Sequence, residues 1–381
     1  MKIIADENIP YVKEAFGTLG EVTLLAGRRM DVASVGDADV LLVRSVTKVN
    51  EALLRGSKVG FVATATIGTD HIDGTYLQSR GISFTSAFGS NANSVVEYLM
   101  AALLNLAKRR EFRLRDKAIG IIGVGNIGSR VVQKARALGM KVLQNDPPLK
   151  RRTRDPKFLP IDDLFEADIL TLHTPLTLEG PDATYHMVNE RFLQRMKPGS
   201  ILINTARGAV VETQALHEAI DRQHLSLVVL DVWENEPHID ASLLEKVTLG
   251  TPHIAGYSLD GKTNGTEMIY RALCKLLGKE PKWCATDCLP PPPVPQIEVQ
   301  VAGRDDEDVL QEVVEKVYDI ERDAAALRGI LKVPKAERGD FFDQKRKEYP
   351  IRREFFNTAL ILRDGSKSLL KKLAALGFRV I

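Results

Sequence analysis

Three charged or titratable side chains follow successive apolar runs in the middle of the chain. Arg207 comes after "ILIN", Glu236 comes after "LVVLDVW", and His253 stands in "TPHIAG". Because parallel strands end at a common edge of a sheet, we expect the three side chains to gather there. A single loop arginine or glutamate is usually a surface charge, and a single histidine is usually structural. Three of them, each beside small or turn-forming residues, favour a catalytic site.

These residue types suit the removal of hydride from an alcohol carbon. Neutral His253 would take the hydroxyl proton, while Glu236 would accept from its other ring nitrogen and fix the tautomer. Arg207 would hold a substrate carboxylate with two parallel donors. Ala255 and Gly256 leave room beside the imidazole for a nicotinamide ring. The set therefore predicts a hydroxy-acid dehydrogenase.

A glycine-rich turn supplies the matching cofactor site. Gly123, Gly125 and Gly128 have G-x-G-x-x-G spacing between an apolar run and a helical pattern. The first glycine permits the tight turn, the second lets a pyrophosphate approach the backbone, and the third lets helix and strand pack closely. Asp146 ends the next apolar run, where its carboxylate would accept from the ribose 2′-hydroxyl and repel a 2′-phosphate. The turn therefore predicts NAD rather than NADP.

The elements that position these residues alternate between strands and helices. Buried parallel strands are expected wherever short β-branched runs recur, in two series: 2–5, 22–27, 39–45, 59–68 and 82–87, then 118–128, 140–146, 167–175, 200–208, 225–233 and 247–256. Helices are expected over 10–19, 50–56, 94–110 and 265–278. This alternation predicts an α/β fold with two Rossmann-like, doubly wound parallel-sheet lobes.

The last part of the chain is predicted to be separate. Four consecutive prolines make 289–295 a stiff linker. Beyond it, 296–381 should form an additional C-terminal α+β domain, with strands over 297–303 and 378–381 and one amphipathic helix over 306–329. The basic run 345–353 is interpreted as a solvated face or a dimer contact, in preference to a nucleic-acid patch.

Composition excludes several classes of protein. The 381 residues carry a net charge of +2, so neither nucleic acid nor a membrane surface is expected as a partner. No uncharged apolar run is long enough for a membrane helix, and the N-terminus lacks a signal-peptide pattern. Three cysteines, Cys274, Cys284 and Cys288, argue for free thiols in a reducing cytoplasm and against a disulfide framework or a metal site.

As a set, "GVGNIG", "TPLT", "NTARGAVV", "DVWENEP" and "TPHIAG" resemble the motifs of the NAD-dependent D-isomer-specific 2-hydroxyacid dehydrogenases. "ADENIPYVKEAFGTLGEVTLLAGR", "VRSVTKVN", "ATATIGTDHID" and the region after the prolines narrow the resemblance. They are similar to the branch that oxidises the C2 hydroxyl of 4-phospho-D-erythronate to (R)-3-hydroxy-2-oxo-4-phosphooxybutanoate in vitamin B6 synthesis.

The resemblance implies site residues, domains and assembly. The first lobe is expected to be split, 1–93 plus 257–288, around an NAD-binding domain over 94–256, and a homodimer is expected through the C-terminal domain. Arg207, Glu236 and His253 are implied as catalytic. Cofactor contacts are implied for Gly123, Gly125, Asn126, Ile127, Gly128, Asp146, Thr174, Ala206, Asp231 and Gly256, and substrate contacts for Ser45, Thr66, Arg207 and Tyr257, with no metal.

Two alternatives stay open at this point. Within the enzymes, the substrate could be another D-2-hydroxy acid, such as glycerate or phosphoglycerate. Outside them, the same scaffold could serve as an NAD-sensing regulatory protein that turns nothing over. The complete set of arginine, glutamate and histidine favours an enzyme.

Overall fold

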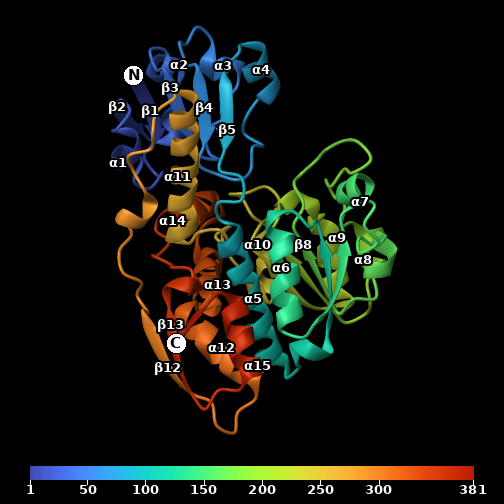
Figure 1. Ribbon diagram of the computed structural model, residues 1–381. Helices are drawn as coiled ribbons and strands as arrows, with labels where there is room; N and C mark the ends of the chain where they lie inside the picture. The colour runs from blue at the N-terminus through green and yellow to red at the C-terminus, as the bar shows by residue number, and fades with distance from the viewer. The chain divides into compact units, whose positions relative to one another are not determined.

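The computed structural model describes residues 1–381, which divide into two compact units (Figure 1). The first unit combines Met1–Ala92 with Tyr257–Pro291. The second combines Asn93–Gly256 with Pro292–Ile381. Each unit is built on a parallel sheet, which confirms the predicted α/β class.

The first unit holds a five-stranded sheet of order β2-β1-β3-β4-β5, in which every pairing is parallel. Its strands are β1 (Lys2–Asp6), β2 (Glu21–Leu25), β3 (Val40–Val43), β4 (Phe61–Thr64) and β5 (Ser83–Ser86). Its helices are α1 (Val12–Phe16), α2 (Val32–Val35), α3 (Glu51–Leu54), α4 (Gly74–Ser79) and α11 (Leu259–Leu276).

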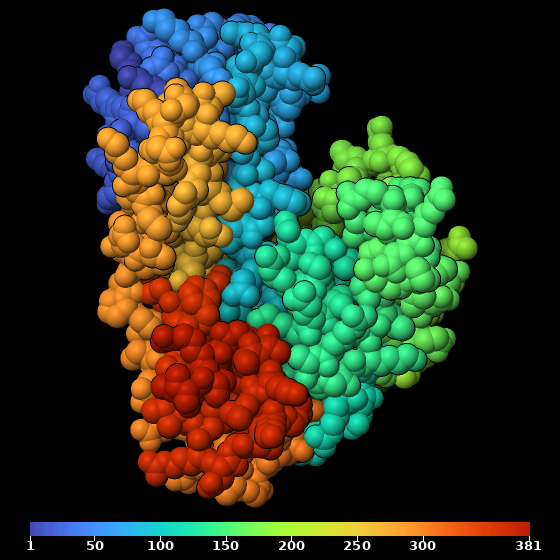
Figure 2. All heavy atoms as spheres, in the orientation of Figure 1, coloured from blue at the N-terminus to red at the C-terminus, as the bar shows by residue number.

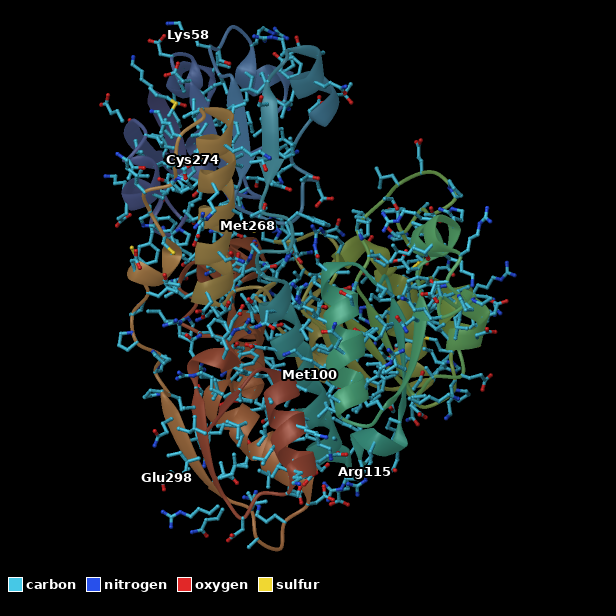
Figure 3. The ribbon with its side chains drawn as sticks, in the orientation of Figure 1. Lys58, Met100, Arg115, Met268, Cys274 and Glu298 are labelled. Atoms are coloured by element: carbon cyan, nitrogen blue, oxygen red, sulfur yellow. The ribbon has the colours of Figure 1, made fainter.

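Both faces of this sheet are covered, and β3 shows how. Val40 and Leu42 pack into one apolar cluster with residues of α1 and α11, while Leu41 and Val43 pack into the other with residues of α2, α3 and α4. Side chains that alternate between two buried faces produce the continuous apolar run seen in the sequence. Cys274 faces the first cluster from α11 (Figure 3), and all three cysteines are free thiols.

The second unit begins at Asn93, within the long helix α5 (Ala92–Arg110), and contains a six-stranded parallel sheet of order β11-β10-β9-β8-β6-β7. Its strands are β6 (Ala118–Ile122), β7 (Lys141–Asn145), β8 (Ile169–Leu172), β9 (Ser200–Asn204), β10 (Leu225–Leu230) and β11 (Leu249–Gly250). Its covering helices are α6 (Asn126–Ala137), α7 (Pro147–Thr153), α8 (Glu190–Arg195), α9 (Thr213–Asp221) and α10 (Ala241–Lys246).

The direction in which strands are added to this sheet reverses at β6. β7 is added on one side of β6, and the next strand, β8, is added on the other side. In open parallel sheets the crevice at such a reversal lies at the carboxyl ends of the strands and binds ligands. The glycine-rich turn follows β6 directly, so the topology places it at this point.

Residues after the prolines belong to the same unit and add a three-stranded parallel sheet, β12-β13-β14. The strands are β12 (Gln296–Gln300), β13 (Ala359–Arg363) and β14 (Arg379–Val380), and the helices are α12 (Asp306–Val317), α13 (Ile320–Arg328), α14 (Arg338–Lys347) and α15 (Lys367–Leu376). Figure 2 shows the end of the chain lying directly against the residues of α6, and α15 makes that contact.

Three sequence predictions need correction. The single helix expected over 306–329 is two, because Tyr318 is extended and the Asp319 side chain caps α13 by accepting from the amide of Arg322. The helix expected from 265 begins at Leu259, where Ser258 caps it. The central strand β13 was not predicted, nor were α14 and α15.

Candidate active site

The Glu236 carboxylate and the His253 imidazole form a hydrogen-bonded pair. Nδ1 of His253 lies 2.7 Å from Oε2 of Glu236, and the two side chains are 33% and 20% exposed. Glu236 follows β10 and His253 follows β11, so both lie beyond the carboxyl ends of adjacent strands. Because Nδ1 is occupied by the carboxylate, Nε2 is the ring nitrogen left to exchange a proton.

Glu236 is held in its charged form. Burial raises its pKa, but the charge and hydrogen bond of His253, the amide of Trp233 and the charge of Arg346 outweigh burial and hold the pKa below its ordinary value. The Trp233 amide donates to Oε1 at 2.8 Å. A carboxylate that stays ionised favours the tautomer with the proton on Nδ1 and stabilises the imidazolium that forms after proton transfer.

The His253 backbone is in the left-handed region, with φ of 57°. A non-glycine residue holds this conformation only where its surroundings fix it. Its amide donates to the carbonyl of Asp231 at 2.7 Å. The Asp231 carboxylate accepts from the amides of Ile254 and Ala255 at 2.8 and 2.9 Å.

Asp231 therefore holds the histidine loop through both carboxylate oxygens. It is 1% exposed, and Thr251 also donates to it at 2.7 Å. Burial raises the pKa of Asp231, although the His253 charge and these hydrogen bonds partly oppose the shift. The resemblance implied a cofactor contact for this residue, and the contacts above are all with the loop that carries His253.

Arg207 follows β9 and starts the loop next to the Glu236 loop. Its guanidinium donates from one terminal nitrogen to the carbonyl of Ala206 at 2.7 Å, and its own carbonyl accepts from Asn204 at 2.9 Å. A methyl group built at Gly208 would lie 1.9 Å from the carbonyl carbon of Trp233, so the two loops touch through backbone.

Trp233 joins the three loops and was not singled out in the sequence. Its backbone contacts Gly208 beside Arg207, its amide binds Glu236, and its indole donates to the carbonyl of Thr251 at 2.8 Å, two residues before His253. A buried indole needs such an acceptor. The signal available in the sequence was a tryptophan between two candidate residues at the end of an apolar run.

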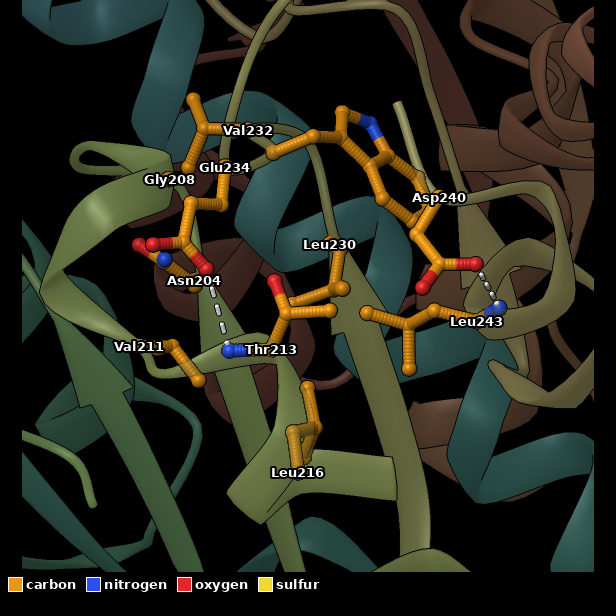
Figure 4. A pocket seen from close by; sticks show the side chains of 11 residues that line it. Asn204, Gly208, Val211, Thr213, Leu216, Leu230, Val232, Glu234, Asp240 and Leu243 are labelled. Atoms are coloured by element: carbon orange, nitrogen blue, oxygen red, sulfur yellow. Dashed lines mark hydrogen bonds between the residues drawn. The ribbon is translucent and has the colours of Figure 1, made fainter. Parts of the chain in front are cut away.

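A small cavity lies beneath these loops, lined by Gly208, Trp233, Glu234 and neighbouring apolar residues (Figure 4). Its free volume is about 10 Å³, enough for one water molecule at most. Glu234 accepts from the Thr213 amide and pairs with His186 at 2.6 Å, which fixes the wall of the cavity. We assign this cavity a supporting role under the loops.

The glycine-rich turn fits a dinucleotide. Gly123 has a φ of 86°, and a side chain there would strike the carbonyl of His173 at 2.6 Å. A methyl group on Gly128 would lie 2.0 Å from the carbonyl oxygen of Gly123, whereas one on Gly125 would meet no protein atom within 4 Å. The open space at Gly125, at the N-terminus of α6, suits a phosphate pair.

Other expected cofactor residues surround this turn. Asp146 directly follows β7, and its carboxylate accepts from the amides of Val124 and Leu149, both at 2.8 Å. The Thr174 hydroxyl is buried and has no partner within the protein, which leaves it available to a ligand. Asn126 and Ile127 begin α6, Ala206 precedes Arg207, and Gly256 follows the His253 loop.

The expected substrate residues Ser45, Thr66 and Tyr257 belong to the first unit. The Arg44 guanidinium donates to the Tyr257 hydroxyl at 3.3 Å, and the Lys262 ammonium lies 4.1 Å from the centre of the Tyr257 ring. The Thr66 hydroxyl is engaged with Thr64 at 2.7 Å. Lys262 was not predicted, because a lysine in a helix gives no signal of its own.

No group of three or more histidine, cysteine, aspartate or glutamate side chains has an arrangement that could hold a metal ion. No helix is both long enough and apolar enough to cross a lipid bilayer.

Comparison with known proteins decides the family. Residues 94–255 match the family model described as D-isomer specific 2-hydroxyacid dehydrogenase, NAD binding domain. The chain is 46% identical to the erythronate-4-phosphate dehydrogenases of Escherichia coli O9:H4 (strain HS) and Shigella boydii serotype 18, over 100% of this chain and 99% of each relative. The chain belongs to the NAD-dependent D-isomer-specific 2-hydroxyacid dehydrogenases.

Solved structures agree with this family. D-lactate dehydrogenase from Aquifex aeolicus, complexed with NAD and lactic acid, is 29% identical with a TM-score of 0.61 and covers 73% of this chain and 96% of its own. NAD-dependent formate dehydrogenase from Staphylococcus aureus, in complex with NAD, is 25% identical with a TM-score of 0.62, over 75% of this chain and 98% of its own.

As a member of this dehydrogenase family, the chain is an enzyme that uses NAD, as the glycine-rich turn predicted. Residues 288–377 match a second model, described only as a domain of unknown function. The family therefore accounts for the glycine turn and the two parallel sheets, and leaves the role of the C-terminal region open.

Proposed function

We propose that this dehydrogenase oxidises the C2 hydroxyl of 4-phospho-D-erythronate to (R)-3-hydroxy-2-oxo-4-phosphooxybutanoate, in the synthesis of pyridoxine 5′-phosphate. The observation that carries the proposal is the identity of 46% to erythronate-4-phosphate dehydrogenases over the whole chain, including the C-terminal region. The hydrogen-bonded Glu236–His253 pair supplies the base that such an oxidation needs.

In the proposed reaction, Nε2 of His253 takes the proton from the C2 hydroxyl. Glu236 keeps the proton on Nδ1 and stabilises the resulting imidazolium. Arg207 grips the substrate carboxylate through two parallel hydrogen bonds. NAD supplies the acceptor for the hydride that leaves C2.

The residues that would hold NAD are those that surround the glycine turn. The amides of Gly125, Asn126, Ile127 and Gly128 would receive the pyrophosphate at the start of α6. Asp146 would accept from the ribose hydroxyls, and the buried Thr174 hydroxyl would meet the nicotinamide side. Ala206, Asp231 and Gly256 would complete the contact, Asp231 acting through the loop that it holds.

In the first unit, the substrate phosphate would bind around Tyr257. Arg44 and Lys262 place two positive charges at this ring, and Ser45 and Thr66 add hydroxyls. A dianionic phosphate is best met by such charge-assisted donors.

We also propose that the enzyme is a homodimer in the cytoplasm. The C-terminal region exposes Ile351 and Phe356, at 57% and 46%, beside a buried segment. Three free cysteines fit a reducing compartment. Light scattering of the protein as it elutes from a size-exclusion column would give the mass of a dimer. The mass of a monomer would refute the proposed homodimer.

The decisive experiment measures NADH formation by the purified protein with 4-phospho-D-erythronate, 3-phospho-D-glycerate and D-glycerate. We expect kcat/KM to be highest for 4-phospho-D-erythronate by at least about tenfold. Preference for one of the other acids would give the enzyme another substrate. NAD binding without turnover of any acid would favour a regulatory protein.

A further inference from the structure

The C-terminal region reaches the histidine loop through a buried arginine. A terminal guanidinium nitrogen of Arg352 donates to the carbonyl of Ala255 at 2.6 Å and to that of Ser94 at 3.3 Å. The residue is 6% exposed, and Ala255 lies two residues after His253. A hydrogen bond from a buried cation to a backbone carbonyl is among the stronger kinds of protein hydrogen bond.

We propose that Arg352 is a positioning residue for His253, and that one role of the C-terminal region is to hold the catalytic loop in its strained conformation. The proposal extends the function proposed above and uses it only for the choice of substrate.

The loop is held from two sides. On one side, Asp231 accepts from the amides of Ile254 and Ala255. On the other side, Arg352 donates to the carbonyl of Ala255. Since His253 has a φ of 57°, this conformation depends on such surrounding contacts, and loss of either one would let the loop relax.

The segment Arg352–Phe355 is itself anchored to the start of α5. The Glu354 carboxylate accepts from the hydroxyl of Ser94 at 2.6 Å and from the amide side chain of Asn93 at 2.7 Å. The Phe355 amide donates to Glu97 at 2.9 Å. These contacts fix the position from which Arg352 reaches the loop.

The guanidinium stays charged in this buried place. The Cζ atom of Arg352 lies 4.4 Å from the centre of the Tyr318 ring. Burial lowers the pKa of Arg352. The nearby phenol groups of Tyr349 and Tyr318 and the carboxyl groups of Glu97 and Asp323 raise this pKa by a larger amount, so the net shift is upward. The charge thus lies against the loop carbonyl at neutral pH.

A second contact from the C-terminal region reaches the other member of the pair. A methyl group built at Gly339, in α14, would lie 2.6 Å from the ring of His238, two residues after Glu236. Arg346, also in α14, lowers the pKa of Glu236 through its charge. The same region therefore packs beside both loops of the Glu236–His253 pair.

The test compares Arg352→Met and Arg352→Lys with Arg353→Met as a matched control. Arg353 is the next residue, is 7% exposed, and donates within the C-terminal region to Asn357 at 2.8 Å. Rates are divided by the number of NAD sites found by titration, so that any unfolded fraction does not count. Substrate deuterated at C2 gives the primary isotope effect on kcat.

We expect Arg352→Met to lower kcat per NAD site by about 10- to 100-fold, because a small displacement of the base is costly. The isotope effect should rise as the chemical step becomes rate-limiting. Arg352→Lys keeps one donor toward Ala255 and should recover part of the rate, which also covers the case in which Arg352→Met fails to fold. Arg353→Met should stay within about twofold of the unsubstituted enzyme.

A readout without turnover separates this proposal from the proposed function. The NMR signals of the His253 imidazole, recorded on protein labelled at histidine, can be assigned with His253→Gln. They should shift in Arg352→Lys and remain in place in Arg353→Met. Unchanged signals, kcat and isotope effect in the Arg352 variants would overturn the proposal, as would equal losses in Arg353→Met. If the unsubstituted protein oxidises no hydroxy acid, only the proposed function fails, and the imidazole signals still decide the role of Arg352.

Discussion

At the scale of single residues, the group that we propose takes the substrate proton is one nitrogen of His253. Its Nδ1 is bound to Glu236 at 2.7 Å, and the ionised carboxylate sets the tautomer. The residue types could be read from the sequence because few groups serve as a base near neutral pH. Their pairing could not, because Glu236 and His253 lie in separate loops whose approach depends on Trp233.

His253→Ala tests the proposed role of this residue as the general base. We expect kcat to fall by about 10²-fold or more, because no other group replaces the general base, while NAD affinity stays the same. Steady-state rates with isothermal titration of NAD would check both parts.

The control for that variant is His217→Ala. His217 pairs with Asp240 at 3.1 Å, so it is another histidine–carboxylate pair in the same unit. It should keep the full rate. A fully active His253→Ala enzyme would remove His253 from the mechanism.

At the scale of elements, the turn between β6 and α6 has two kinds of glycine. Gly128 is required by the protein itself, because its hydrogen atoms face the carbonyl of Gly123. Gly125 faces open space, where a side chain would meet no protein atom within 4 Å, and we propose that only a bound pyrophosphate requires a glycine there. The spacing predicted the turn, but only the tertiary structure separates the two roles.

The separation predicts different outcomes for two alanine variants. Gly125→Ala should leave the free energy of unfolding within about 0.5 kcal/mol and weaken NAD binding at least about tenfold, since its methyl group lies where the pyrophosphate would approach. Gly128→Ala should lose about 1–3 kcal/mol of stability as well, because backbone must move.

Urea unfolding and NAD titration would measure both quantities, with Gly74→Ala as the control at another open glycine. Normal NAD affinity in Gly125→Ala would show that the pyrophosphate does not approach this residue.

Some elements were readable from the sequence and others were not. Strands such as β3 and β9 are buried on both faces, so each is a short apolar run between turn residues. The helix expected over 306–329 looked continuous because its apolar period continues through Tyr318, and the break comes from a cap at Asp319. The local apolar period indicates which side chains are buried. It does not indicate where a capping residue ends one helix and starts the next.

At the scale of the whole molecule, His173 makes stability depend on pH. Burial lowers its pKa to about 3, whereas an unfolded histidine titrates near 6.5. Below pH 6.5 the unfolded chain binds a proton that the folded chain refuses, so this contribution to stability is complete above pH 6.5 and declines as the pH falls toward 3.

His173→Asn should therefore reduce the loss of stability between pH 6.5 and pH 5. The full effect of one proton is about 1.4 kcal/mol per pH unit, and because the side chain keeps some exposure we take this as the upper limit. Urea unfolding of both proteins at pH 7.5, 6 and 5 would measure the difference in slope. Equal slopes would show that His173 becomes protonated in the folded protein.

The sequence by itself determined the α/β class, the glycine turn and the cofactor, and it supplied the types of the proposed catalytic residues. These follow from rules that act over a few residues: strand and helix periods, turn chemistry and strand ends that share an edge. Only the tertiary structure decided which nitrogen of His253 faces Glu236, and that Arg352, 97 residues beyond Ala255, holds the same loop. Such contacts depend on long-range packing, and no local pattern records them.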